Sequence, residues 1–375
     1  MEPRKDRLTF IDVMRGIAVV WMIETHVIDV VLNEWLKKGA GYGLLNISNG
    51  FVAVSFIFCA GAGFWLAAQK KVNDYKAFNP PLWIYLRRLM LILIIGYCLH
   101  LPTPSLSGLF DVPTESWMMF YESDILQCIV YTSLISLVLL LVIPRLKIVP
   151  LVFGVLAFAV FFISPWIWSW NSMSSLPAFL GALFAEPPIS KFPLFPWSGY
   201  FFGGVALTAL FMQSKNKSRL SWLIILSGFA ISAMMINFKL LGTEYPEISN
   251  WWKGSPGHSL FRFFGTVGVF GLLYLTEKYY KNNMLGKHLR IAGQESLFLY
   301  VSHLLIVYNS MNMGIDVIFG TSLNYMQSLL IFVLITLICY TGAYYWHKLK
   351  ANNIKRARLV MTVTFSVLIF FFIIT

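Results

Sequence analysis

The chain has 375 residues, of which 58% are hydrophobic and only 12% are charged, and its mean hydropathy is +0.69. A soluble domain carries about 25% charged residues, so this composition excludes an ordinary soluble protein. The net charge of +12 resides in short breaks between apolar runs, so we expect no nucleic-acid partner. The four cysteines lie inside apolar runs without a CxxC pair, which argues against disulfides and a bound metal.

Apolar runs of about twenty residues recur along the whole chain, and each is long enough to cross the hydrocarbon layer of a membrane as a helix. The sequence therefore predicts an all-α, polytopic integral membrane protein with about 11 transmembrane helices in a single domain, residues 1–375. The predicted spans are 10–32, 49–69, 82–101, 119–143, 148–165, 195–213, 220–238, 259–276, 291–311, 325–346 and 359–375.

The breaks between these spans alternate in charge. Of the 29 Lys and Arg residues, 22 are assigned to the side of the N-terminus and only five to the other side. The positive-inside rule then predicts a cytoplasmic N-terminus and an outward C-terminus. The short loops favour the cell (plasma or inner) membrane of a bacterium over a eukaryotic internal membrane.

The first predicted span carries ionisable side chains, which are costly in a membrane and usually functional. Asp12, Arg15, His26 and Asp29 fall within an arc of about 100° on one helix face. Arg15 and His26 are separated by roughly 16 Å along the axis. We predict that Arg15, held by Asp12, grips a phosphate or carbonyl oxygen. We also predict that His26, oriented by Asp29, exchanges a proton.

Simpler interpretations of the same residues stay open. Arg15 would snorkel to the cytoplasmic interface, His26 would be a packed and satisfied core histidine, and Asp29 would cap the helix or face water. Glu24 lies off this face, and we expect it to bond a neighbouring helix.

The segment Phe10–Ala18 resembles the first helix of the transmembrane acyltransferase superfamily. This superfamily includes heparan-α-glucosaminide N-acetyltransferase, its bacterial relatives and the acyltransferase-3 proteins. Arg15 and His26 match the Arg-ten residues-His motif of the acyltransferase-3 branch. Further resemblances follow in family order, so that the motifs lie within residues 8–303. They are Arg87-Arg88, Asp124–Gln127, Phe195–Gly203 and Gly293–His303.

The resemblance implies an acyltransferase that moves an acyl group, expected to be acetyl, from cytoplasmic acyl-CoA to a hydroxyl or amine of an extracytoplasmic saccharide. His26 would be the general base, with Asp29 beside it, and a route through acyl-His26 stays open. Donor binding is assigned to Arg15, Asp12, Arg87 and Arg88. The acceptor or oxyanion candidates are Ser296, Tyr300 and His303, which share a helix face, together with Asp124 and Gln127.

Several alternatives remain at this point. The animal N-acetyltransferase has Asn in place of His26 and its essential His in the following loop, whereas residues 33–48 contain no His, so the acceptor is open. Arg87 and Arg88 would otherwise be topology determinants, and the acceptor candidates would be polar contacts between helices. A proton-coupled transporter or flippase that uses buried acidic residues is the second function considered, and an inactive scaffold is the third. Membrane lipid is an expected partner, and a homo-oligomer is left open.

Overall fold

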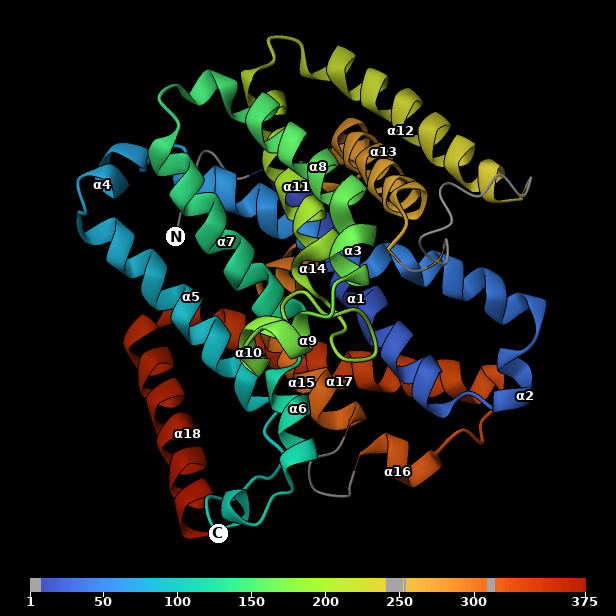
Figure 1. Ribbon diagram of the computed structural model, residues 1–375, viewed down its shortest axis with the longest axis vertical. Coiled ribbons are helices and arrows are strands. Elements are labelled where there is room, and N and C mark those ends of the chain that lie inside the picture. Colours follow the sequence, from blue (N-terminus) through green and yellow to red (C-terminus); the bar gives the residue numbers. More distant parts are fainter. Residues whose placement is uncertain (1–7, 241–251, 253, 309–313) are drawn as a thin grey trace. The chain divides into compact units, whose positions relative to one another are not determined.

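The computed structural model describes residues 8–240, 252, 254–308 and 314–375, and they are overwhelmingly helical (Figure 1). Among these described residues, nine helices are long and apolar enough to cross a membrane. They are α3 (Ala40–Ala68), α5 (Pro80–Cys98), α7 (Ile125–Val142), α8 (Val149–Ser169), α11 (Leu194–Gln213), α12 (Lys217–Leu240), α13 (Pro256–Tyr280), α17 (Tyr325–Asn352) and α18 (Ile354–Ile374). The prediction of an all-α, multi-pass membrane protein is confirmed.

The other two predicted spans differ from these nine. The first is one continuous helix, α1 (Thr9–Val31). It has too many charged side chains to be included among the nine apolar helices. The span 291–311 is divided into α14 (Met284–Gln294) and α15 (Ser296–Val307), with the break at Glu295. The count of eleven and the cytoplasmic N-terminus therefore stay predictions.

The contacts within the chain divide it into two compact units. The first unit contains Met1–Ala53, Thr103–Val112 and Thr276–Thr375, and the second contains Val54–Pro102 and Pro113–Leu275. The single domain expected from the sequence stays a prediction, and the two units are described separately below.

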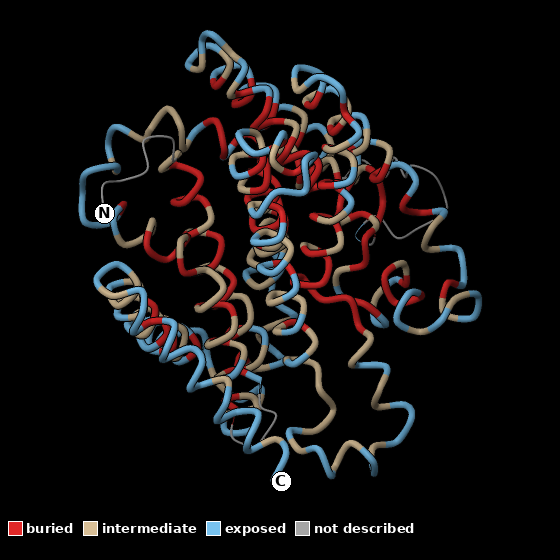
Figure 2. The backbone as a smooth tube through the Cα atoms, turned by 90° about the vertical axis from the view of Figure 1, so that its left-hand side faces the viewer, coloured by how far each residue is buried: buried red, intermediate tan, exposed pale blue. Residues whose placement is uncertain are grey.

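In the first unit, α1 packs against α14, α15 and α17. Two glycines allow α1 and α14 to touch backbone to backbone. A Cβ atom on Gly16 would lie 1.9 Å from the carbonyl oxygen of Leu289, and one on Gly293 would lie 1.9 Å from that of Asp12. No side chain larger than hydrogen fits this crossing. In contrast, α18 is exposed along nearly all of its length (Figure 2), as a lipid-facing helix would be.

Glu295, at the break between α14 and α15 in the first unit, pairs with two side chains of α17. The Glu295 carboxylate is buried and lies 2.8 Å from Nδ1 of His347 and 2.5 Å from Nζ of Lys350, both on α17. These contacts compensate the carboxylate, whose charge would otherwise be costly to bury. They also join the α14–α15 break to α17.

Replacing Glu295 with glutamine should lower the thermal stability of the purified protein by about 1–3 kcal/mol, because a buried charged acceptor is lost. Thermal unfolding in detergent measures this effect. The matched control is Glu34→Gln, because Glu34 forms an ion pair of 2.7 Å with Lys37 but is largely exposed. Exposed pairs contribute about 0–1 kcal/mol, so equal losses in the two variants would contradict the interpretation.

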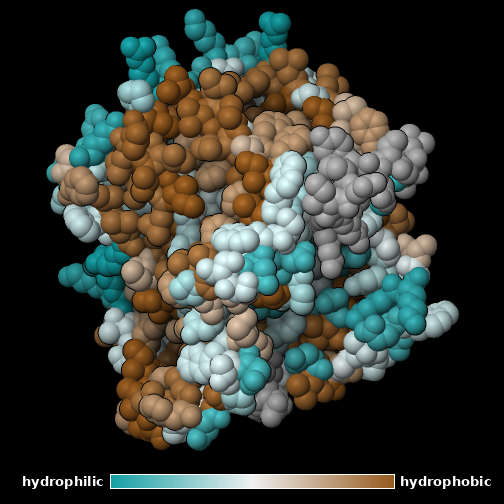
Figure 3. Space-filling view, viewed as in Figure 1, coloured by the Kyte–Doolittle hydropathy of each residue, from teal (hydrophilic) through white to brown (hydrophobic). Residues whose placement is uncertain are grey.

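In the second unit, α11 lies at the centre and packs against α7 and α8. Its contact with α13 again depends on a glycine, since a Cβ atom on Gly203 would lie 2.2 Å from the ring of Phe263. Fully buried phenylalanines such as Phe161 and Phe201 fill the space around α11. On the outside, apolar side chains of α7 and α8 cover a continuous area (Figure 3), which a bilayer would cover.

Candidate active site

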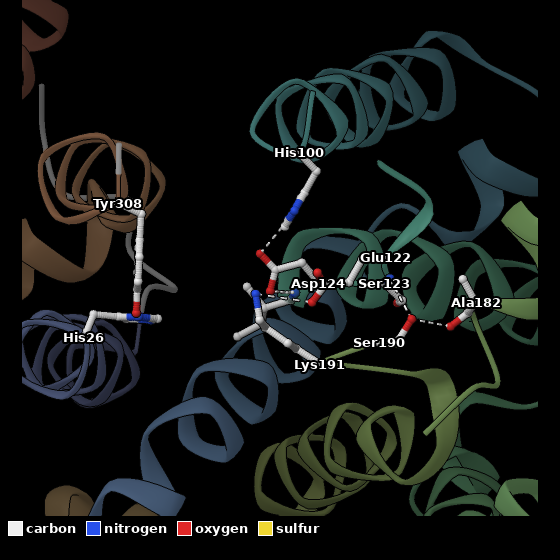
Figure 4. A network of polar contacts seen from close by, with 10 residues as sticks. His26, His100, Glu122, Ser123, Asp124, Ala182, Ser190, Lys191 and Tyr308 are labelled. Carbon is white, nitrogen blue, oxygen red and sulfur yellow. Dashed lines mark hydrogen bonds and ion pairs between the residues drawn. The ribbon is translucent and has the colours of Figure 1, made fainter. Parts of the chain in front are cut away.

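In the first unit, His26 lies within a cluster of four aromatic rings, which we call the His26 cluster: His26, Tyr300, His303 and Tyr308. Nδ1 of His26 is 2.8 Å from the hydroxyl oxygen of Tyr308, which follows the last residue of α15 (Figure 4). The His26 ring centroid lies 5.3 Å from that of His303 and 5.4 Å from that of Tyr308. Tyr300 packs edge-on against His303 at 5.7 Å.

Hydrogen bonding defines the tautomer of one imidazole in the cluster. Nδ1 of the fully buried His303 is 2.8 Å from the carbonyl oxygen of Leu299. A carbonyl only accepts hydrogen bonds, so Nδ1 carries the hydrogen and the neutral ring keeps its lone pair on Nε2. Tyr308 is a donor or an acceptor toward His26. When it accepts from Nδ1–H, Nε2 of His26 has the lone pair that a general base needs.

Asp29 was assigned the role of orienting His26, but the structure places Tyr308 at Nδ1 of the imidazole. The Asp29 side chain is exposed, and its carboxylate accepts a hydrogen bond of 3.0 Å from the Tyr42 hydroxyl. A catalytic role for Asp29 therefore stays a prediction. Glu24 behaves as expected, since it hydrogen-bonds Asn49 of α3, which also accepts from Trp21.

The predicted donor residues Asp12 and Arg15 lie near the start of α1. Asp12 is buried, and its carboxylate accepts a hydrogen bond of 3.2 Å from the Gln294 side chain, beside the Gly16–Gly293 crossing. Arg15 is half-buried. Because α1 is continuous from Thr9 to Val31, Arg15 and His26 keep the predicted separation of roughly 16 Å on one face.

The structure brings two of the three α15 candidates to His26. Tyr300 and His303 are buried members of the His26 cluster, whereas Ser296 is the first residue of α15, almost two turns before His303.

The second unit contains the remaining candidates. Asp124 caps the start of α7, where its Oδ1 accepts from the backbone N–H of Ile125, and its Oδ2 lies 3.2 Å from Nε2 of His100. Glu122 next to it is buried and lies 3.4 Å from Nζ of Lys191 (Figure 4). The pairing of His100 with Asp124 was not predicted, and we call it the His100–Asp124 pair.

Gln127 lies one turn after Asp124 on α7. It is fully buried, and neither atom of its amide has a hydrogen-bond partner among the described residues. Leaving a buried polar group unsatisfied costs about 1–3 kcal/mol, so a water molecule or ligand group is expected there. A Cβ atom on Gly96 of α5 would lie 3.0 Å from the Gln127 carbonyl oxygen. Arg87 and Arg88 on α5 are exposed, and their role in donor binding stays a prediction.

Residues 7–237, more than half of the chain, match the family model described as heparan-alpha-glucosaminide N-acetyltransferase, catalytic. The chain belongs to this family. The resemblance to transmembrane acyltransferases is thereby confirmed, and membership implies a membrane acetyltransferase. The family uses acetyl-CoA as its donor and a saccharide as its acceptor in general. No curated protein and no solved structure matches the chain.

The matched segment of this N-acetyltransferase family covers α1 through most of α12. It contains His26 and the His100–Asp124 pair, but not α15. The resemblance of Gly293–His303 to the wider superfamily therefore stays a prediction. Two rings of the His26 cluster, Tyr300 and His303, lie on α15, and Tyr308 follows its last residue.

Sequence reasoning missed Tyr308 and His100. Tyr308 is five residues after His303, a spacing that places it on a different face of a continuous helix, so only the end of α15 at Val307 brings it to His26. His100 lies near the end of the predicted span 82–101, and no role was predicted for it. Its signal was a histidine next to a helix end, which is weak without a known partner.

Replacing Tyr308 with phenylalanine should lower kcat for acetyl transfer about 10- to 100-fold, because the ring stays but the hydrogen bond to the His26 imidazole is lost. The KM for acetyl-CoA should change little, and steady-state kinetics separates the two constants. The control is Tyr325→Phe. The Tyr325 hydroxyl lies outside the His26 cluster and donates a hydrogen bond of 3.2 Å to the carbonyl oxygen of Leu36. A wild-type kcat in Tyr308→Phe would contradict a positioning role.

Proposed function

We propose that this protein transfers the acetyl group of cytoplasmic acetyl-CoA to a hydroxyl or amine of an extracytoplasmic saccharide, with His26 as the general base. The observation that supports it most is the hydrogen-bonded His26 imidazole on the first helix of a chain that belongs to this acetyltransferase family. The family match favours this function over a transporter or flippase.

In the proposed reaction, Nε2 of His26 takes a proton from the hydroxyl or amine of the acceptor. The oxygen or nitrogen of that acceptor group attacks the thioester carbonyl of acetyl-CoA at the same time. The tetrahedral intermediate then expels the CoA thiolate, and the imidazolium returns the proton to that thiolate. Tyr308 holds Nδ1 and thereby fixes the ring. In an alternative sequence, the imidazole itself accepts the acetyl group before it passes to the saccharide.

The tautomer of His303 refines its role. When neutral, His303 presents a lone pair on Nε2 toward an acceptor O–H or N–H. When protonated, it would donate from Nε2 to an oxyanion, and Nδ1–H bonds the carbonyl of Leu299 in both forms. We assign it to orienting an acceptor O–H or N–H beside His26. The hydroxyl of Tyr300 is the better candidate for oxyanion stabilisation, because it is a donor.

The donor would lie along α1 in this proposal. Arg15 would bind a phosphate or the carbonyl of coenzyme A, roughly 16 Å from His26, and the long flexible arm of coenzyme A suits such a separation. The exposed Arg87 and Arg88 would attract the polyanionic donor from the cytoplasm.

In the second unit, Asp124 and Gln127 are retained as candidates for contacts to a saccharide. Saccharide hydroxyl groups are both donors and acceptors, and this region offers a carboxylate, an imidazole and an unsatisfied amide. Ser296 and Asp29 are retained as secondary candidates.

Reconstituted vesicles with the protein in one orientation test the proposal. Labelled acetyl-CoA is supplied on the side of the N-terminus and glucosamine-containing oligosaccharides on the other. The expected result is labelled saccharide that forms only across the membrane, with an acyl-enzyme trapped by acid quench if the reaction has two steps. Absence of acetyl-CoA binding, or transfer only on the donor side, would contradict it.

A further inference from the structure

A basic segment of the second unit, residues 70–88, contains the short helix α4 (Val72–Lys76) and the first turns of α5, and we call it the α4–α5 segment. It has one acidic residue, Asp74, whose carboxylate accepts a hydrogen bond of 3.2 Å from the Asn79 side chain. Its five basic residues are all exposed, and they are Lys70, Lys71, Lys76, Arg87 and Arg88. The segment therefore presents a strongly positive surface beside a membrane span.

Two large aromatic rings are exposed within the same segment. Phe78 is 64% exposed and has a φ of +53°, a left-handed backbone conformation that a bulky residue adopts only at a cost. Its carbonyl oxygen accepts a hydrogen bond of 3.1 Å from the indole N–H of Trp83, which is 59% exposed. Glycine adopts this conformation without strain, so the phenyl ring of Phe78 opposes folding and fills no core. A strained residue of this kind is typical of a binding surface.

The exposed rings continue into an apolar stripe along α5. One face of this helix carries Trp83, Arg87, Met90 and Ile94, which follow one another at intervals of four, three and four residues. All four side chains are exposed. In a membrane protein, an exposed apolar stripe along a span faces lipid. Arg87 therefore lies on the lipid-facing side of α5, between a tryptophan and the apolar part of the span.

Charge and position together select the occupant of this surface. Clusters of about four to eight Lys and Arg residues beside a span are typical of sites for anionic lipid headgroups. Exposed tryptophan at the end of a span is typical of the membrane interface, where the ring lies at the level of the headgroups. A soluble anion would neutralise the basic groups but would leave the rings of Phe78 and Trp83 in water. A phospholipid with a negative headgroup matches both features.

We propose that the α4–α5 segment binds an anionic phospholipid of the adjacent leaflet. The basic side chains contact the phosphate and the negative headgroup, and the rings of Phe78 and Trp83 pack at the level of the glycerol and the upper acyl chain. The site lies entirely within the second unit, and it does not depend on the proposed acetyl transfer.

The test uses the full-length protein in a neutral detergent and measures the binding of two lipids with the same acyl chains by native mass spectrometry. The lipids are phosphatidylglycerol, which is anionic, and phosphatidylcholine, which has no net charge. The wild type should bind phosphatidylglycerol at least about tenfold more tightly. The double variant Lys70→Gln, Lys71→Gln should lower this ratio at least about fivefold, because each basic group near an anionic headgroup strengthens binding by about that factor.

The matched control is the double variant Lys215→Gln, Arg219→Gln. It removes the same charge from two exposed positions in another basic break, which is predicted to lie on the same side of the membrane. The control should keep the wild-type ratio, because the general positive charge of this side is not the proposed site.

The variant Phe78→Gly separates binding from folding. It removes the exposed ring and the backbone strain, and it keeps the carbonyl group that accepts from Trp83. The affinity for phosphatidylglycerol should fall about threefold or more, whereas the unfolding temperature in detergent without lipid should stay the same or rise.

Four results would overturn the inference. They are equal affinity of the wild type for the two lipids, equal losses in the two double variants, wild-type affinity in Phe78→Gly, and complete displacement of phosphatidylglycerol by soluble coenzyme A. The last result would assign the basic groups to a soluble polyanion.

Discussion

Replacing His26 with glutamine should lower the rate of acetyl transfer by about 10²–10⁴-fold, the range that general bases commonly contribute. Glutamine keeps a polar side chain of similar reach toward Tyr308 but cannot take a proton. Acetyl-CoA binding should be retained, because the donor contacts proposed for Arg15 lie three turns away on α1. Rapid-quench kinetics with labelled acetyl-CoA would measure transfer, and equilibrium binding would measure the donor.

The first unit offers a matched control for this experiment. His288 on α14 also forms a histidine–tyrosine pair, with Nδ1 lying 2.6 Å from the hydroxyl of Tyr340. His288→Gln removes the same kind of hydrogen bond at a place with no proposed chemistry, and it should keep transfer near the wild-type rate. Full activity in His26→Gln, or equal losses in both variants, would remove His26 from the mechanism.

Replacing Gly16 with valine should prevent the first unit from folding stably, at a cost of about 3 kcal/mol or more. The added Cβ atom would meet backbone atoms of α14 at 1.9 Å, and a backbone cannot rotate away as a side chain can. The helices would have to separate, and the hydrogen bond between Asp12 and Gln294 would break with them. Yield of folded protein and thermal unfolding in detergent would report the loss.

Gly43 on α3 provides the comparison. No atom lies within 4 Å of a Cβ atom built on Gly43, so Gly43→Ala should keep or raise stability, since alanine favours a helix by about 0.5–1 kcal/mol over glycine. An unfolding temperature for Gly16→Val equal to that of Gly43→Ala would show that α1 and α14 do not cross at these glycines.

The candidate site was partly predictable. The placement of Arg15 and His26 could be predicted from the sequence, and the hydrogen-bond partner of His26 could not. The placement of Arg15 and His26 on one face of α1 follows from helical periodicity alone, because 3.6 residues per turn relates any two positions on a continuous helix. The partner of His26 was assigned to Asp29 by the same reasoning. The structure instead places there a tyrosine 282 residues away in the sequence. Helical periodicity orients side chains within one helix and carries no information about a second helix.

By itself, the sequence determined that this protein is a helical, multi-pass membrane protein and which residues share a face of its first helix. Both follow from local physics, because an apolar run of about twenty residues satisfies its own backbone hydrogen bonds as a helix in lipid. Only the tertiary structure decided the Gly16–Gly293 crossing, the ring cluster around His26, the His100–Asp124 pair and the division of the span 291–311 at Glu295. Each of these depends on which helices meet. Apolar surfaces of similar composition pack against one another or against lipid with little difference in hydrophobic energy, so close fit and a few polar contacts make the choice.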